Sequence, residues 1–135
     1  MGLDNGIYVK SNKRKLTRLD LPVGIRYPFE KDYGEDIEIL YWRKNWGLRN
    51  AVLNHFGTRL SDEYITEIDT PDKVLDLMQI IVDFMDEKKW EDEGNSIWTY
   101  KEIIPILKDN IVTLALIAGY IQENPDVYLE FYDSY

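Results

Sequence analysis

The sequence contains no cysteine and only one histidine, His55, among its 135 residues. Without thiols the chain can form neither a disulfide framework nor a thiolate metal site. A single histidine would leave a structural zinc site to carboxylates, which zinc seldom uses in that role. We therefore expect a domain that is stabilised by its hydrophobic core, with no metal and no cofactor.

Long apolar segments are also missing. The longest nearly apolar run, residues 111–121, is interrupted by Thr113 and is too short to span a bilayer. The first residues lack both the basic start and the apolar core of a signal peptide. These absences predict a cytoplasmic protein with no membrane partner.

Motifs of the common catalytic sites are absent too. Gly47 and Gly57 have none of the neighbours that a phosphate-binding loop requires, and no serine lies in a nucleophile elbow. No residue is therefore predicted to be catalytic. One enzymatic alternative stays open, a small hydrolase or nuclease that uses His55 and nearby acids.

What the sequence does contain is enough apolar material for one folded domain. Hydrophobic residues make up 44% of the chain and aromatic residues 13%, which excludes a disordered chain despite the high charge. The length suits a single domain over residues 1–135.

The net charge of −9 is unevenly distributed along the chain. Residues 1–59 carry eleven Lys or Arg and seven Asp or Glu, a net charge of +4, whereas residues 60–135 carry five and eighteen, a net charge of −13. The acidic half is a candidate contact surface, and nucleic-acid mimicry is one version of that hypothesis. The alternative is that both halves pack together and the charges are solvated.

Hydrophobic periodicity predicts the elements of secondary structure. Alternating residues indicate strands at about 6–10, 36–41, 63–68 and 127–132, with a further short strand at 23–27. Helical spacing indicates helices at about 43–56, 71–88 and 99–123, with an acidic loop over 90–96. Because the order has no regular βαβ repeat, we expect an α+β fold in which three helices pack on one side of a small, mostly antiparallel sheet of four or five strands.

Several local signals refine these boundaries. Thr70 followed by Pro71 is typical of a helix start, and Thr99 with Glu102 matches the capping box. Pro105 should bend the last helix or move its effective start. Gly119 in the same helix favours a close approach of another element.

A candidate binding site lies where the second strand meets the first helix. Trp42, Arg43 and Lys44 combine an aromatic ring with two cations, which suits an anionic ligand or an interface anchor. Trp46 and His55 on the following helix complete this candidate site. The alternative is that Trp42 belongs to the core and the two cations cover it with their stems.

A second candidate is the basic cluster formed by Lys13, Arg14, Lys15 and Arg18. Such residues contact phosphates in nucleic-acid-binding proteins, and Arg43, Lys44 and Arg49 could extend this patch. No aromatic residue interleaves the cluster, so a solvated loop is the alternative.

Three segments together carry a resemblance to known proteins. They are the start Met1–Gly2–Leu3–Asp4, the element Tyr41–Trp42–Arg43–Lys44 before a helix, and the aromatic end that closes on Asp133–Ser134–Tyr135. In these segments the chain resembles a group of small uncharacterised proteins from bacteriophages and prophages. The resemblance implies an accessory protein in the cytoplasm of a bacterial host. Such a protein would act without catalysis, by binding a host protein or a second copy of itself.

Overall fold

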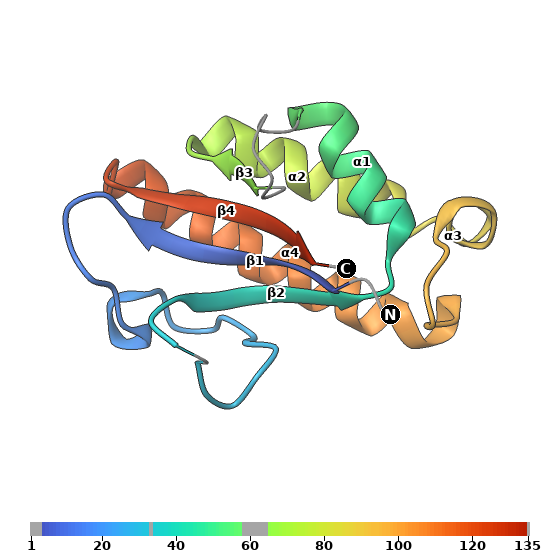
Figure 1. The fold of residues 1–135 in the computed structure, drawn as a ribbon, viewed down its shortest axis with the longest axis horizontal. Helices are drawn as coiled ribbons and strands as arrows, with labels where there is room; N and C mark the ends of the chain where they lie inside the picture. Colours follow the sequence, from blue (N-terminus) through green and yellow to red (C-terminus); the bar gives the residue numbers. More distant parts are fainter. Residues whose placement is uncertain (1–3, 33, 58–64, 135) are drawn as a thin grey trace.

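The structure is a computed structural model that describes residues 4–32, 34–57 and 65–134 (Figure 1). Its four strands form one antiparallel sheet in the order β2-β1-β4-β3. The strands are β1 (Asp4–Ser11), β2 (Ile37–Arg43), β3 (Ile65–Ile68) and β4 (Val127–Ser134). The helices are α1 (Trp46–Phe56), α2 (Pro71–Asp83), α3 (Glu87–Glu93) and α4 (Tyr100–Glu123), with a short 3-10 helix η1 (Arg18–Asp20). The predicted α+β class is confirmed, with four helices in place of three.

The first and last strands of the chain lie side by side at the centre of the sheet. In their register Ile7 pairs with Phe131 and Val9 pairs with Leu129, and all four side chains are buried in the core. Successive residues of a strand point to opposite faces, so Tyr8 and Tyr132 lie on the other face. This pairing sets which strand residues can form a site together.

Helix α4 runs behind the sheet and α2 lies beside it (Figure 1). By length and composition α4 could cross a membrane, but six of its apolar residues, from Ile103 to Ile121, are buried in the domain. The Trp42 indole N–H donates a hydrogen bond to Asn110 Oδ1 at 2.9 Å and so joins β2 to α4. These contacts are those of a core helix, so α4 gives no reason to place the chain in a membrane.

The prediction of a loop at residues 90–96 is wrong for its first part, because residues 87–93 form helix α3. Asp86 caps this helix by accepting a hydrogen bond from the Lys89 backbone N–H at 3.0 Å, and Trp90 anchors it in the core. The backbone N–H of Gly47 at the start of α1 donates to the Gly94 carbonyl just after α3. A Cβ at Gly47 would lie 2.0 Å from the Glu93 carbonyl oxygen, so only glycine permits this contact.

The starts of α2 and α4 agree with their capping signals, whereas two other helix boundaries differ from the prediction. Thr70 and Thr99 cap α2 and α4 as predicted. Helix α1 begins at Trp46 rather than Arg43, because β2 extends to Arg43 and Asn45 supplies the cap. The helix predicted over 71–88 is too long, because α2 ends at Asp83 and a separate helix, α3, begins at Glu87 after its cap Asp86.

Two further predictions are wrong, the strand at residues 23–27 and the close contact of Gly119. Residues 23–27 form no strand; Val23 lies in a turn and is 97% exposed. Gly119 makes no close contact with a described residue, since a Cβ there would meet none of their atoms within 4 Å. Pro105 does not move the start of α4, which begins at Tyr100 after its cap Thr99, and the alternative that Pro105 bends the helix stays a prediction. The strand predicted over 63–68 is seen from Ile65, and Glu63 and Tyr64 lie outside the described residues.

Candidate binding site on the open face of the sheet

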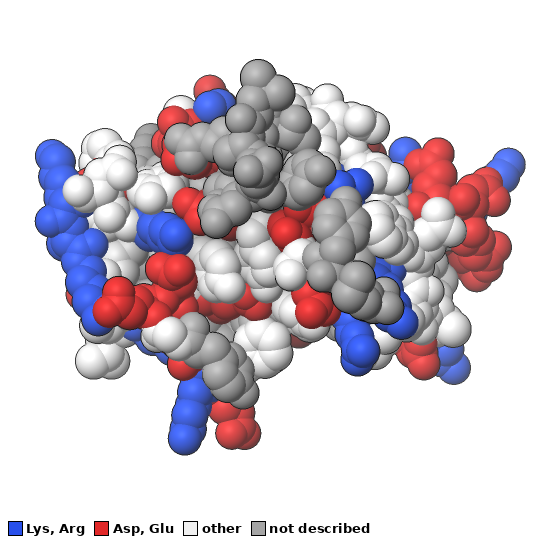
Figure 2. All heavy atoms as spheres, viewed as in Figure 1, with Lys and Arg blue, Asp and Glu red and all other residues white. Residues whose placement is uncertain are grey.

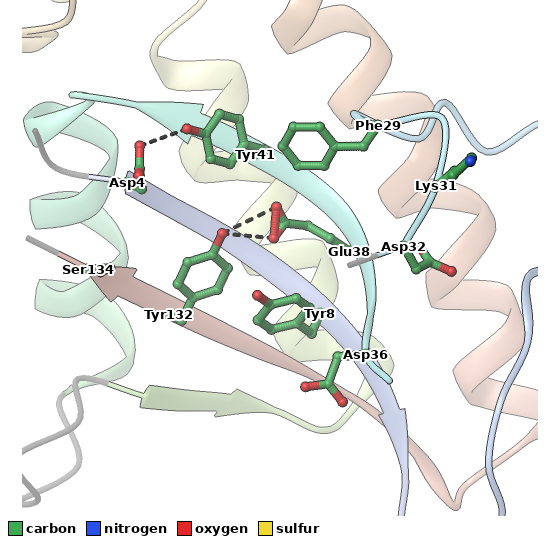
Figure 3. A pocket seen from close by; sticks show the side chains of 10 residues that line it. All are labelled: Asp4, Tyr8, Phe29, Lys31, Asp32, Asp36, Glu38, Tyr41, Tyr132 and Ser134. Atoms are coloured by element: carbon green, nitrogen blue, oxygen red, sulfur yellow. Dashed lines mark hydrogen bonds between the residues drawn. The ribbon is translucent and has the colours of Figure 1, made fainter. Parts of the chain in front are cut away.

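The face of the sheet opposite α4 contains a hollow of about 290 Å³ (Figure 3). Side chains from β1, β2 and β4 form its floor, and the loop before β2 forms one rim. Three tyrosines and one phenylalanine line it together with four acidic residues and one lysine. The lining residues are Asp4, Tyr8, Phe29, Lys31, Asp32, Asp36, Glu38, Tyr41, Tyr132 and Ser134.

Glu38 lies at the centre of this hollow (Figure 3). Its carboxylate accepts a hydrogen bond from the Tyr132 hydroxyl, at 2.7 Å to Oε2 and 3.2 Å to Oε1. The ring of Tyr8 stacks on that of Tyr132, with centroids 4.8 Å apart and planes 19° apart. Glu38 and Tyr8 are also paired across β2 and β1.

Gly6 makes room for this arrangement. A Cβ at Gly6 would lie 2.9 Å from Tyr132 Cε1 and 2.6 Å from the Leu40 carbonyl oxygen. The missing side chain therefore allows the Tyr132 ring to lie against β1 and its hydroxyl to reach Glu38.

The environment of Glu38 opposes its negative charge. The residue is 8% exposed, and burial raises the pKa of its carboxyl group from 4.5 to about 7, although the hydrogen bond from Tyr132 acts in the opposite direction. Burial and the neighbouring Glu38 together raise the pKa of Tyr132, which stays a hydrogen-bond donor at neutral pH. Near pH 7 the Glu38 carboxyl group can therefore gain or lose a proton, and a nearby cation would favour its ionised form.

The other acids of the hollow have partners of their own. Asp32 accepts hydrogen bonds from Arg18, at 2.8 Å from Nη2 and 3.1 Å from Nε. Asp36 lies 3.6 Å from the Lys10 ammonium. Asp4 accepts a hydrogen bond of 2.7 Å from the Tyr41 hydroxyl, and burial raises the pKa of Tyr41 to about 12.

The predicted basic cluster is largely engaged within the protein. Arg18 binds Asp32 and also donates to the carbonyls of Phe29 and Glu30, so it holds the loop that borders the hollow. Arg14 donates to Asp126 at 3.0 Å and to Asn124. Lys15 lies 3.9 Å from Glu35, and Lys13 is exposed. Two of the four cations thus stabilise the fold, and nucleic-acid binding by the cluster stays a prediction.

The five predicted binding residues do not gather on one surface. Trp42 is 1% exposed in the core, as its alternative interpretation proposed, whereas Arg43 is exposed at the end of β2. Lys44 turns the chain with a φ of 52°, and the ring of Trp46 lies 5.4 Å from the Arg49 guanidinium. None of the five lines the hollow described above.

His55 occupies the last turn of α1, exposed to solvent. Its Nε2 lies 3.1 Å from Asp76 Oδ2 on α2, and both side chains are about half exposed. A surface pair of this kind contributes little to stability. Among the residues that the structure describes, no three His, Asp or Glu side chains gather where a metal ion could bind.

Acidic and basic side chains are mixed on the face shown in Figure 2. Its densest group of carboxylates lies at the end of the molecule formed by α3, next to basic side chains. The described part of this face therefore presents no single acidic field, and nucleic-acid mimicry gains no support from it.

The residues of the hollow were not recognised as a site in the sequence. Its four acids, Asp4, Asp32, Asp36 and Glu38, all come from the half of the chain with net positive charge. The available signal was Glu38 itself, an acid between Ile37 and Ile39 in a mostly apolar strand. Comparison of the chain with protein-family models, curated proteins and solved structures gives no match.

Proposed function

We propose that this chain is a non-enzymatic binding protein and that the sheet face around the hollow is its contact surface. The observation that carries the proposal is the half-buried tyrosines Tyr8, Tyr41 and Tyr132, which line a hollow that no described helix covers. Tyrosine is enriched in protein interfaces because it offers a large apolar ring with a polar end at low entropic cost. The resemblance to phage proteins leads us to propose a protein of the bacterial host as the partner.

A pull-down with matched variants tests this function. Tagged wild-type protein, Tyr8→Ala and Tyr120→Ala would be incubated with nuclease-treated and untreated bacterial lysate. Tyr120 is a suitable control because it is also half-buried but lies on α4, away from the open face. We expect one stoichiometric protein that survives nuclease treatment, binds wild type and Tyr120→Ala, and is lost with Tyr8→Ala.

Other results would overturn the proposal. A partner that binds all three proteins equally would place the contact surface elsewhere. Prey that disappear after nuclease treatment would instead favour the basic cluster and nucleic acid. If the pull-down captures the chain itself and sedimentation velocity shows a dimer, the partner is a second copy of the chain and not a host protein.

A further inference from the structure

Two buried glutamates lie on either side of Tyr8 on the open face of the sheet. Tyr8 pairs with Glu38 of β2 on one side and with Glu130 of β4 on the other. The two carboxylates have similar burial, at 8% and 9% residue exposure. They differ in their partners, because Glu130 accepts a hydrogen bond of 2.9 Å from the Lys10 ammonium. Glu38 forms no ion pair with any described residue.

The basic residues near the hollow are not placed to neutralise Glu38. Arg18 is bound to Asp32, and Lys10 lies between Glu130 and Asp36. Lys31 lines the rim, but its nitrogen points away from Glu38 (Figure 3). A buried carboxylate without a counter-ion is costly, and a cation that enters from outside would relieve this cost.

The surroundings of Glu38 suit such a cation. Tyr8, Tyr132 and Tyr41 present aromatic rings around the hollow, and aromatic rings attract cations through their negative faces. Asp4 contributes a second carboxylate, which accepts a hydrogen bond from the Tyr41 hydroxyl and forms no ion pair among the described residues. The hollow of about 290 Å³ has room for one long side chain.

We infer that the hollow receives one basic side chain, a guanidinium or an ammonium group, of the partner protein, with Glu38 as its counter-ion. This inference rests on the proposed function and names the chemistry that the contact surface recognises. Charge complementarity selects the occupant, since the hollow offers two carboxylates, Glu38 and Asp4, that form no ion pair with the part of the chain that the structure describes.

An NMR titration tests the inference with small probes. N-acetyl-arginine amide and N-acetyl-lysine amide would be added to isotope-labelled protein at pH 8, where Glu38 is ionised, and the amide shifts of Tyr8, Glu38 and Tyr132 followed. N-acetyl-citrulline amide is the control probe, because it has the shape of the arginine probe without the charge. We expect saturable shifts with a basic probe and none with citrulline.

Two variants then assign the counter-ion. Glu38→Gln should raise the Kd of the basic probe by at least about tenfold, because the charge-assisted contact is lost. Glu35→Gln removes the same charge from an exposed side chain outside the hollow and should leave the Kd unchanged. If Glu38→Gln does not fold, Asp4→Asn provides a second test and should also weaken binding.

Several outcomes would overturn the inference. They are equal binding of citrulline, a Kd that Glu38→Gln and Asp4→Asn leave unchanged, or no saturable shift with either basic probe. Tighter binding of a free diamine than of the blocked amino acids would overturn the assignment to a protein side chain. Should the pull-down still depend on Tyr8 while no basic probe binds, this inference alone fails and the contact surface stands.

Discussion

Replacing Glu38 by glutamine should make the protein more stable at alkaline pH. Because the pKa of Glu38 in the folded state, about 7, lies above the ordinary value of 4.5, the folded protein binds the proton more tightly than the unfolded chain. The favourable contribution is complete below pH 4.5 and is lost as the pH rises through 7. At about 1.4 kcal/mol per pKa unit the loss could reach about 3.5 kcal/mol, and we expect about 2 kcal/mol because the hollow is open to water.

Urea denaturation of wild type and Glu38→Gln at pH 5 and pH 8 measures this effect. Glutamine can still accept the Tyr132 hydrogen bond but carries no charge, so the two proteins should differ little at pH 5. At pH 8 the variant should be more stable by about 2 kcal/mol. Glu130→Gln is the control, and it should destabilise the protein at pH 8 because Lys10 loses its buried partner. A stability difference between wild type and Glu38→Gln that does not change with pH would refute the reasoning.

Two further predictions concern the packing of the helices. Gly47→Ala should destabilise the protein by about 2 kcal/mol in urea denaturation, since its Cβ would clash with the Glu93 carbonyl, whereas Gly119→Ala on the open side of α4 should stabilise it by about 0.5–1 kcal/mol. Equal effects of the two substitutions would contradict the tight α1–α3 contact. Asn110→Leu should cost about 1–3 kcal/mol because the buried Trp42 N–H loses its acceptor, and an unchanged urea midpoint would show that this bond adds nothing.

Most of the regular elements could be predicted from the sequence because their signals are local. Thr70 with Pro71 and Thr99 with Glu102 satisfy backbone groups within one helical turn, so no distant residue changes their effect. The strands β1, β2 and β4 likewise follow from short alternating or β-branched segments.

Where the sequence interpretation went wrong, a distant contact decided the structure. Helix α3 was expected as part of an acidic loop because Glu91, Asp92 and Glu93 suggested solvent, but burial of Trp90 and the contact of Gly94 with Gly47 hold it as a helix. The helical position of Gly119 is compatible with a close contact, yet none of the described elements approaches it.

The sequence by itself determined the α+β class, the caps of α2 and α4 and the absence of thiol chemistry, all of which depend on residue type and near neighbours. The tertiary structure alone decided the candidate site, because it pairs the first strand with the last and so places Tyr8 beside Tyr132. It also decided that Glu130 has Lys10 as a partner while Glu38 has no ion pair among the described residues. Residues separated by more than ninety positions meet there, and no local pattern records which of them share a face.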